Sequence, residues 1–300
     1  MDRKSIPAIR LADGDQLRLR EKGIVSVSFN ELMDNDPIRR MPHYHDYFQV
    51  SIMKGRGQLM HDFREIEITG TTVFFLSPGQ VHTAKPEAGM SGSIVSFTRE
   101  FFESSPDAEI SGLYQLPFFH GSTGLPWLSL DSHQSEVAHR IFHEIQSEFD
   151  QAEPGAESLI RSLLNILFIK CSRWHAEIHP NPANGRAARL VARFHQTVEM
   201  HFAEWHQLSP YAKALGVTEN HLNYVIRDEL GESAGSLIRK RRQLDAKRML
   251  LHSDLSISEI CYRLGFKDPS YFARFFRRYE KLTPAAFRDR IREKYQKIPE

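Results

Sequence analysis

The last third of the chain carries hydrophobic residues at helical spacing on both sides of a glycine turn. The apolar positions before the turn are Ile257, Ile260 and Leu264, and those after it are Phe272, Phe275 and Phe276. Gly265 stands where a helix ends in a left-handed conformation that glycine adopts at little cost. Asp268 and Pro269 are typical of the cap and the first position of a second helix. The pattern predicts a helix-turn-helix, whose second helix enters the major groove of DNA.

A weaker copy of this pattern surrounds Gly216, 49 residues upstream. We expect Ser209 to cap its first helix and Pro210 to open it. Gly216 then ends that helix, and Thr218 caps the next one. Between the copies, residues 234–251 form another apolar-periodic stretch, which predicts a helical strut that holds the two second helices apart.

The N-terminal half alternates short β-branched and aromatic runs with Gly and Pro. The runs are residues 24–29, 47–53, 57–60, 71–76 and 91–97. Short strands at this spacing predict a small antiparallel barrel. Two helical patterns follow, with apolar positions at Val137, Ile141, Ile145 and Phe149, and at Leu159, Leu163, Ile166 and Leu167. They predict helices that pack on the barrel, on a second copy of themselves, or on both.

The region between Ile257 and Arg288 contains a dense set of motifs. They are Gly265-Phe266, Ser270-Tyr271-Phe272, Arg274-Phe275-Phe276 and Leu282-Thr283-Pro284-Ala285-Ala286-Phe287-Arg288. This string resembles the signature of AraC/XylS-type transcription regulators, and a plain α-hairpin with a basic solvated face is the alternative. The family expects an Arg-Leu-x-x-Ala run on the strut, where this chain has Arg242-Gln243-Leu244-Asp245-Ala246. That departure is small, because Arg242 and Ala246 still match.

Two further segments, Pro42–Gln49 and Ser77–His82, resemble the half-motifs of a cupin barrel, which is the common sensing domain of AraC-type regulators. Two of their histidines, His43 and His45, point the same way if they lie on one strand, and His82 would complete a three-imidazole site for Zn, Fe or Ni. Cupin enzymes usually place a carboxylate four residues after the second histidine, where this chain has Gln49. We therefore predict no metal and no cofactor, and assign the four polar side chains to the effector or to hydrogen bonds within the barrel. Those four are His43, His45, Gln49 and His82.

Charge divides the chain into two parts of opposite sign. The whole protein has a formal net charge of +1. From Arg186 onward there are 22 Lys and Arg residues against 14 Asp and Glu, whereas the preceding part has 17 against 24. A basic domain joined to an acidic one indicates that one part alone binds a polyanion such as DNA.

These patterns predict an α+β multidomain protein. We place a cupin-like effector-sensing barrel at residues 1–130, packing or dimerisation helices at 131–177, a Pro- and Asn-rich linker at 178–186, and a double helix-turn-helix domain at 187–300. Cys171 and Cys261 fall in separate predicted domains, which excludes a disulfide framework. No apolar run has spanning length, so we expect a soluble cytoplasmic protein that contacts no membrane.

The resemblance implies a sequence-specific regulator of promoter DNA that is an activator and no enzyme, and that a small-molecule effector controls. A homodimer through residues 131–176 and contact with RNA polymerase, if it is an activator, are the implied protein partners. By position in the motif, the residues expected to face DNA bases are Asn220, His221, Asn223, Tyr224, Ser270, Tyr271 and Arg274, while Thr218, Arg227, Lys267 and Arg277 lie beside them as caps or phosphate contacts. The alternative function is a cupin-type metal-dependent oxygenase or isomerase with a helical tail.

Overall fold

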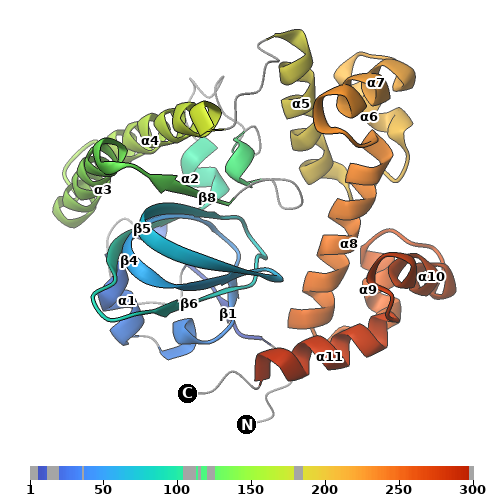
Figure 1. Ribbon diagram of the computed structural model, residues 1–300, viewed down its shortest axis with the longest axis horizontal. Coiled ribbons are helices and arrows are strands. Elements are labelled where there is room, and N and C mark those ends of the chain that lie inside the picture. The colour runs from blue at the N-terminus through green and yellow to red at the C-terminus, as the bar shows by residue number, and fades with distance from the viewer. Residues whose placement is uncertain are drawn as a thin grey trace. The chain divides into compact units, whose positions relative to one another are not determined.

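The computed structural model describes residues 6–11, 20–35, 37–103, 113, 116–119, 126–178 and 185–296. The chain separates into two compact units (Figure 1). Among the described residues, the N-terminal unit comprises those from 7 to 178, and the C-terminal unit comprises 185–296. Most of the expected linker, residues 179–184, lies outside the described residues.

A six-stranded antiparallel sheet forms the centre of the N-terminal unit. Its strands are β2 (Ile24–Ser28), β4 (Phe48–His61), β5 (Arg64–Leu76), β6 (His82–Pro86), β7 (Ser91–Phe97) and β8 (Trp127–Leu130). Their order is β2-β7-β4-β5-β8, with β6 paired to β4 beyond the end of β7. The expected closed barrel is thus corrected to an open, cupin-like sheet, because in the described residues the strand order does not return on itself. A separate short pair joins β1 (Ala8–Ile9) to β3 (Tyr44–His45).

The two faces of the sheet differ because neighbouring residues of a strand point to opposite sides. On one face, Val50 and Ile52 join a core with three helices, α2 (Arg99–Glu103), α3 (Ser132–Gln151) and α4 (Ala156–Ile178). On the other face, Met53 packs with residues of α1 (Phe29–Asn35), which is followed by the 3-10 helix η2 (Pro37–Arg40). Figure 1 shows α3 and α4 on one side of the sheet and α1 on the other.

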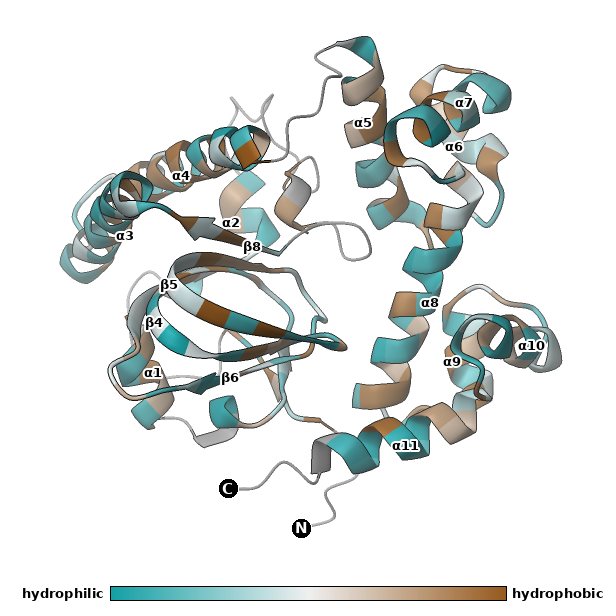
Figure 2. Cartoon of the chain, in the orientation of Figure 1, coloured by the Kyte–Doolittle hydropathy of each residue, from teal (hydrophilic) through white to brown (hydrophobic). Residues whose placement is uncertain are grey.

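The two predicted helices after the sheet are present as α3 and α4. Asp131 caps α3, because its side chain accepts a hydrogen bond from the backbone N of Gln134, and Asp131 N in turn donates to Oε1 of Gln134. Hydrophilic residues cover the outer side of α3 (Figure 2). The described residues include no helix that is long and apolar enough to cross a membrane.

The C-terminal unit consists of helices in the described residues. They are α5 (Arg186–His201), α6 (Leu208–Leu215), α7 (Glu219–Leu230), α8 (Ala234–His252), α9 (Ile257–Arg263), α10 (Pro269–Glu280) and α11 (Pro284–Gln296). We call α6 and α7 the first helix pair, and α9 and α10 the second. In Figure 1, α8 runs from the first pair to the second, as the strut interpretation predicted.

Most of the predicted helix ends are confirmed. Gly216 and Gly265 have positive φ angles of 70° and 72°, and Thr218 and Asp268 accept hydrogen bonds from the first turns of α7 and α10. The prediction for Ser209 is wrong, because α6 already begins at Leu208 and its N-terminal cap residue makes no side-chain bond. These caps fix where each second helix starts, and therefore which side chains it presents.

Candidate functional sites

The second helix of the first pair, α7, presents a polar and aromatic face to solvent. Asn220 and His221 are exposed in its first turn, and Tyr224 follows one turn later with 67% of its surface exposed. The opposite face is held by buried Leu222 and Ile226. An exposed tyrosine on a helix that is otherwise well packed is available for contact with a partner.

The side chain of Asn223 is not part of this solvent-exposed face of α7. Its side-chain Oδ1 accepts a hydrogen bond from the backbone N of Ala234 at 3.1 Å, which ties α7 to the first turn of α8. Recognition of adenine by an asparagine requires both the oxygen and the nitrogen of the amide. Since this oxygen is already bonded, Asn220 is better placed than Asn223 to read an adenine.

The second helix of the second pair, α10, has a comparable exposed face. Ser270 and Arg274 are exposed, and Tyr271 has 57% of its surface exposed. Phe272 and Phe276 are fully buried beneath them, whereas Phe275, which we expected to be buried, is half-buried. The remaining predicted residues, namely Thr218, Arg227, Lys267 and Arg277, are also exposed. Both pairs therefore carry exposed donors and acceptors at the start of their second helix.

A buried arginine of α8 fastens this helix to the second pair. Nη2 of Arg242 donates to the carbonyl oxygen of Leu264 at 2.9 Å, and its guanidinium lies 3.9 Å from the ring centre of Phe266. Burial lowers the pKa of Arg242 to about 10, so this side chain stays charged at neutral pH. Arg241 and Arg248 are buried too. Part of the positive charge that follows Arg186 in the sequence is therefore structural.

A basic groove beside the first pair was not predicted. It is lined by Arg186, Arg189, Leu190, Arg193, Leu215, Gly216, Val217 and His221. The three arginines are exposed and recur at intervals of three and four residues, which places them on one side of α5. The spacing of these arginines is visible in the sequence, but their position next to the start of α7 depends on how α5 packs.

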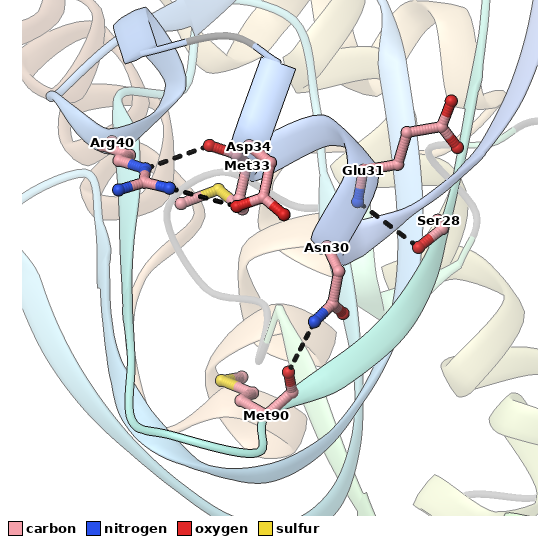
Figure 3. Close-up of polar contacts among 7 residues, drawn as sticks. All are labelled: Ser28, Asn30, Glu31, Met33, Asp34, Arg40 and Met90. Atoms are coloured by element: carbon pink, nitrogen blue, oxygen red, sulfur yellow. Dashed lines mark hydrogen bonds and ion pairs between the residues drawn. The ribbon is translucent and has the colours of Figure 1, made fainter.

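In the N-terminal unit, a cavity lies between the sheet and the α1–η2 segment. Its lining residues are Phe29, Leu32, Met33, Arg39, His43, Gln49, Ser51, Met53, Leu59, Phe74, Leu76, His82, Ala84 and Ile94. Most of them are apolar, and three of the four predicted effector-binding residues are among them. Figure 3 shows one attachment of the α1 side: Asn30 Nδ2 donates to the carbonyl oxygen of Met90, directly before β7, at 3.3 Å. A mostly apolar cavity with a few polar groups is typical of a small-molecule site.

The three predicted histidines do come together. The ring centre of His82 lies 4.3 Å from that of His43 and 4.6 Å from that of His45. Each ring has Nδ1 within 3.1 Å of a backbone carbonyl oxygen. A carbonyl oxygen only accepts, so Nδ1 of each ring carries a proton.

Burial lowers the pKa of both His45 and His82 well below its ordinary value, and the neighbouring His43 lowers it further. Both rings are therefore neutral at physiological pH. His45 is fully buried beside Tyr47, whose ring stacks on it at 4.1 Å, and it is not part of the cavity lining. Among the described residues, no group of three or more His, Cys, Asp or Glu side chains is arranged to hold a metal ion.

Two family models match the chain. The AraC-like ligand binding domain matches residues 33–165, which contain most of the cavity lining, and a helix-turn-helix domain matches residues 211–290, which contain most of α6 and all of α7, α9 and α10. The chain is also similar to the HTH-type transcriptional activator RhaR of Escherichia coli (strain K12). The two are 23% identical over 250 residues, which is 82% of this chain and 86% of RhaR.

Solved structures are similar to a part of the chain or to most of it. The DNA-binding domain of AdpA, in complex with a target DNA, is 27% identical and covers 37% of this chain and 96% of its own, with a TM-score of 0.33. ToxT from Vibrio cholerae strain SCE256, bound to an unsaturated fatty acid, is 14% identical and covers 92% of this chain and 97% of its own, with a TM-score of 0.43.

Proposed function

Because this chain belongs to the AraC family of transcription regulators, with a ligand-binding domain and a helix-turn-helix DNA-binding domain, we propose that it activates transcription when a small molecule occupies its cavity. The observation that carries the proposal is the pair of exposed polar faces on α7 and α10, joined by one helix in the same unit. RNA polymerase is the protein partner that an activator requires. The proposed location is the cytoplasm, where we expect the promoter DNA, and no catalytic role is assigned.

The proposed base contacts come from the two exposed faces. Arg274 has the fork of donors that pairs with guanine, and Asn220 has the amide that pairs with adenine. His221, Tyr224, Ser270 and Tyr271 flank them. Replacing Arg274 by alanine is expected to cost about 1–3 kcal/mol of binding free energy and to relax the preference at one base pair.

The proposed phosphate contacts surround these faces. Arg227, Lys267 and Arg277 are exposed cations close to the base-reading residues. We add Arg186, Arg189 and Arg193, because their groove opens beside His221 at the start of α7. Cations at such positions neutralise phosphates and fix the register of a protein on DNA without reading the sequence.

A homodimer through α4 is also proposed. Leu159, Ile166 and Ile169 are exposed, with 45%, 45% and 36% of their surfaces accessible, and they recur on one side of the helix. Apolar side chains in a row on an exposed helix favour pairing with a second copy. Replacing Ile166 by glutamate is expected to yield monomers in analytical ultracentrifugation, whereas the same change at exposed Ser162 should not.

The test of the proposed function is binding of the full chain to its promoter DNA by fluorescence anisotropy. Specific DNA should bind roughly 10³-fold or more tightly than a scrambled duplex of equal length. Adding the effector should change that ratio if the effector binds the DNA-competent and DNA-incompetent states with different affinity. A ligand with equal affinity for both states would not change their populations. Equal binding to both duplexes would contradict the DNA-reading role, and a ratio that no tested metabolite changes would contradict the sensing role.

A further inference from the structure

The turn of the second helix pair, between α9 and α10, lies against the segment that joins α5 to α6. A Cβ atom added to Gly265 would lie 2.3 Å from the carbonyl oxygen of Ala203 and 2.5 Å from Nε2 of His206. Non-bonded carbon atoms are best separated by roughly 3.5–4.0 Å, so a side chain at this position would collide with backbone. Gly265 is therefore required for close packing as well as for its positive φ of 72°.

The segment that joins α5 to α6, residues 202–207, is itself attached to the first helix pair. The hydroxyl of Tyr211, a residue of α6, donates to the carbonyl oxygen of Trp205 at 3.0 Å, and Trp205 packs against the hydrophobic core around that tyrosine. Nε2 of His206 donates to the carbonyl oxygen of Ala203 at 2.9 Å, because a carbonyl oxygen only accepts. The surface that meets the turn of the second pair is thus held in place by the first pair.

The same turn is also attached to α8. Arg242 donates to the carbonyl oxygen of Leu264, and its guanidinium lies over the ring of Phe266. The ring of His206 is nearly parallel to that of Phe266, at an angle of 19° with the ring centres 6.3 Å apart. The turn therefore contacts both α8 and the α5–α6 segment. Two separate attachments prevent the second pair from pivoting about α8 alone.

The turn of the first pair has the same backbone conformation without this close contact. Gly216 has a φ of 70°, but nothing in the described part of the chain lies within 4 Å of a Cβ atom built on it. Gly231, at the end of α7, has a φ of 71° and equally open surroundings among the described residues. A positive φ is a local requirement that all three glycines share, whereas the close contact of Gly265 depends on packing between distant segments.

We propose that the contact of Gly265 with Ala203 and His206 fixes the orientation of α10 relative to α7, and thereby makes the chain select one spacing of its two DNA half-sites. This assignment rests on the proposed reading of DNA by both helix pairs. Gly265 and His206 are positioning residues, because they act through the orientation of α10. A fixed orientation favours one spacing, since little conformational freedom is lost when the second pair binds after the first.

The experiment measures the affinity of the full chain for three DNA duplexes by fluorescence anisotropy. The first carries both half-sites at the spacing found by selection from randomised DNA, the second has two more base pairs between them, and the third keeps one half-site. Two base pairs rotate one half-site by about 70° around the DNA axis. The unmodified chain should bind the first duplex at least roughly 10-fold more tightly than either of the others, and Gly265→Ala should lower both ratios to below roughly 3-fold.

Gly231→Ala is the matched control, because it adds the same methyl group at a similar positive φ with no described atom within 4 Å of it. This control should keep both affinity ratios. His206→Ala removes the ring beside Phe266 and adds no atom, so it tests the contact without a collision and should also lower both ratios. Thermal melting establishes which variants are folded.

Two results would overturn the proposal: a folded Gly265→Ala chain that keeps both ratios, or a Gly231→Ala chain that loses them equally. If Gly265→Ala does not fold, His206→Ala decides by the same criterion. Failure of the proposed joint reading is measured separately, on the unmodified chain. If that chain binds the duplex with one half-site as tightly as the duplex with two, the two pairs do not read DNA together, whatever the variants do.

Discussion

Arg241 and Arg242 are consecutive on α8, yet their guanidinium groups contact different elements of the C-terminal unit. Nε of Arg241 donates to Glu199 of α5 at 2.6 Å, and its guanidinium lies 3.9 Å from the ring centre of Phe202, next to the first pair. Arg242 bonds Leu264 and lies over Phe266, in the turn of the second pair. Successive helical residues point about 100° apart, so two neighbouring side chains reach both sides of the strut.

The contact of Arg242 predicts a stability effect. Arg242→Ala removes a buried cation, leaves the Leu264 carbonyl without this donor and opens space over Phe266. We expect the free energy of unfolding of the C-terminal unit to fall by about 2–4 kcal/mol, measured by urea titration. The exposed Arg239 on the same helix is the matched control, and Arg239→Ala should change it by less than about 0.5 kcal/mol. Equal losses of unfolding free energy in both variants would mean that the buried contacts of Arg242 make no specific contribution to stability.

Two asparagines of α7 should have different roles, one in recognition of the DNA sequence and the other in protein stability. Asn223→Ala removes the acceptor for the Ala234 N–H and should cost about 1 kcal/mol of stability, with the preferred DNA sequence unchanged. Asn220→Ala should leave stability unchanged and relax the preference at one base pair. Selection from randomised DNA sites, together with thermal melting, measures both. The assignment fails if Asn223→Ala alters the sequence preference and Asn220→Ala does not.

The arginines of α5 should contribute to affinity without specificity. Replacing Arg189 by alanine should weaken binding to all sequences alike and reduce the slope of log K against log salt by about 1. The exposed Arg64 of the N-terminal unit is a suitable control, since its replacement should leave the slope unchanged. A normal slope for Arg189→Ala would place α5 away from the DNA backbone.

Local signals in the sequence predicted the helical unit well. The glycines at 216 and 265 and the caps at Thr218 and Asp268 each act within a few residues, so their effect is legible without the rest of the fold. The misassigned cap at Ser209 shows the limit, because where α6 begins depends on neighbouring packing. The convergence of His43 and His82 came from the family resemblance, since residues so far apart meet only through strand pairing.

Long-range packing decided what the sequence did not reveal. In α8, Arg241 and Arg242 are buried because α5 and the turn after α9 pack against them, whereas Arg239 and Lys240 of the same basic run are exposed. Arg39 had no motif to mark it, and it lines the cavity only because η2 folds over the sheet. Openness of the sheet likewise depends on pairing among distant strands, which composition and alternation do not determine.

The buried histidines predict that acid destabilises the N-terminal unit. His45 and His82 are neutral in the folded state because burial lowers the pKa of each, whereas an unfolded histidine takes up a proton near pH 6.5. Below about pH 6.5 the unfolded state therefore binds protons that the folded state does not, and the free energy of unfolding decreases as pH falls. Each histidine contributes up to about 1.4 kcal/mol per pH unit.

Thermal melting of the full chain at pH 7.5 and pH 5.5 checks this dependence. The transition of the N-terminal unit should occur at a lower temperature at pH 5.5, and a variant with both His45→Gln and His82→Gln should show a smaller shift. A transition that is equally stable at both pH values would show that protons reach these rings in the folded state.

The most direct test of the account is the spacing of the two DNA half-sites that one chain reads. Because α8 holds both helix pairs in a single unit, their second helices should enter successive major grooves on one face of DNA, about one helical turn or roughly 34 Å apart. Inserting five base pairs between the half-sites rotates one of them to the opposite face. We predict that the affinity of the full chain then falls to its affinity for non-specific DNA. A ten-base-pair insertion restores the face of the DNA but doubles the distance between the half-sites, which the rigid α8 cannot span, so we expect the same loss of affinity. Unchanged affinity after the five-base-pair insertion would contradict the claim that the two pairs read DNA together.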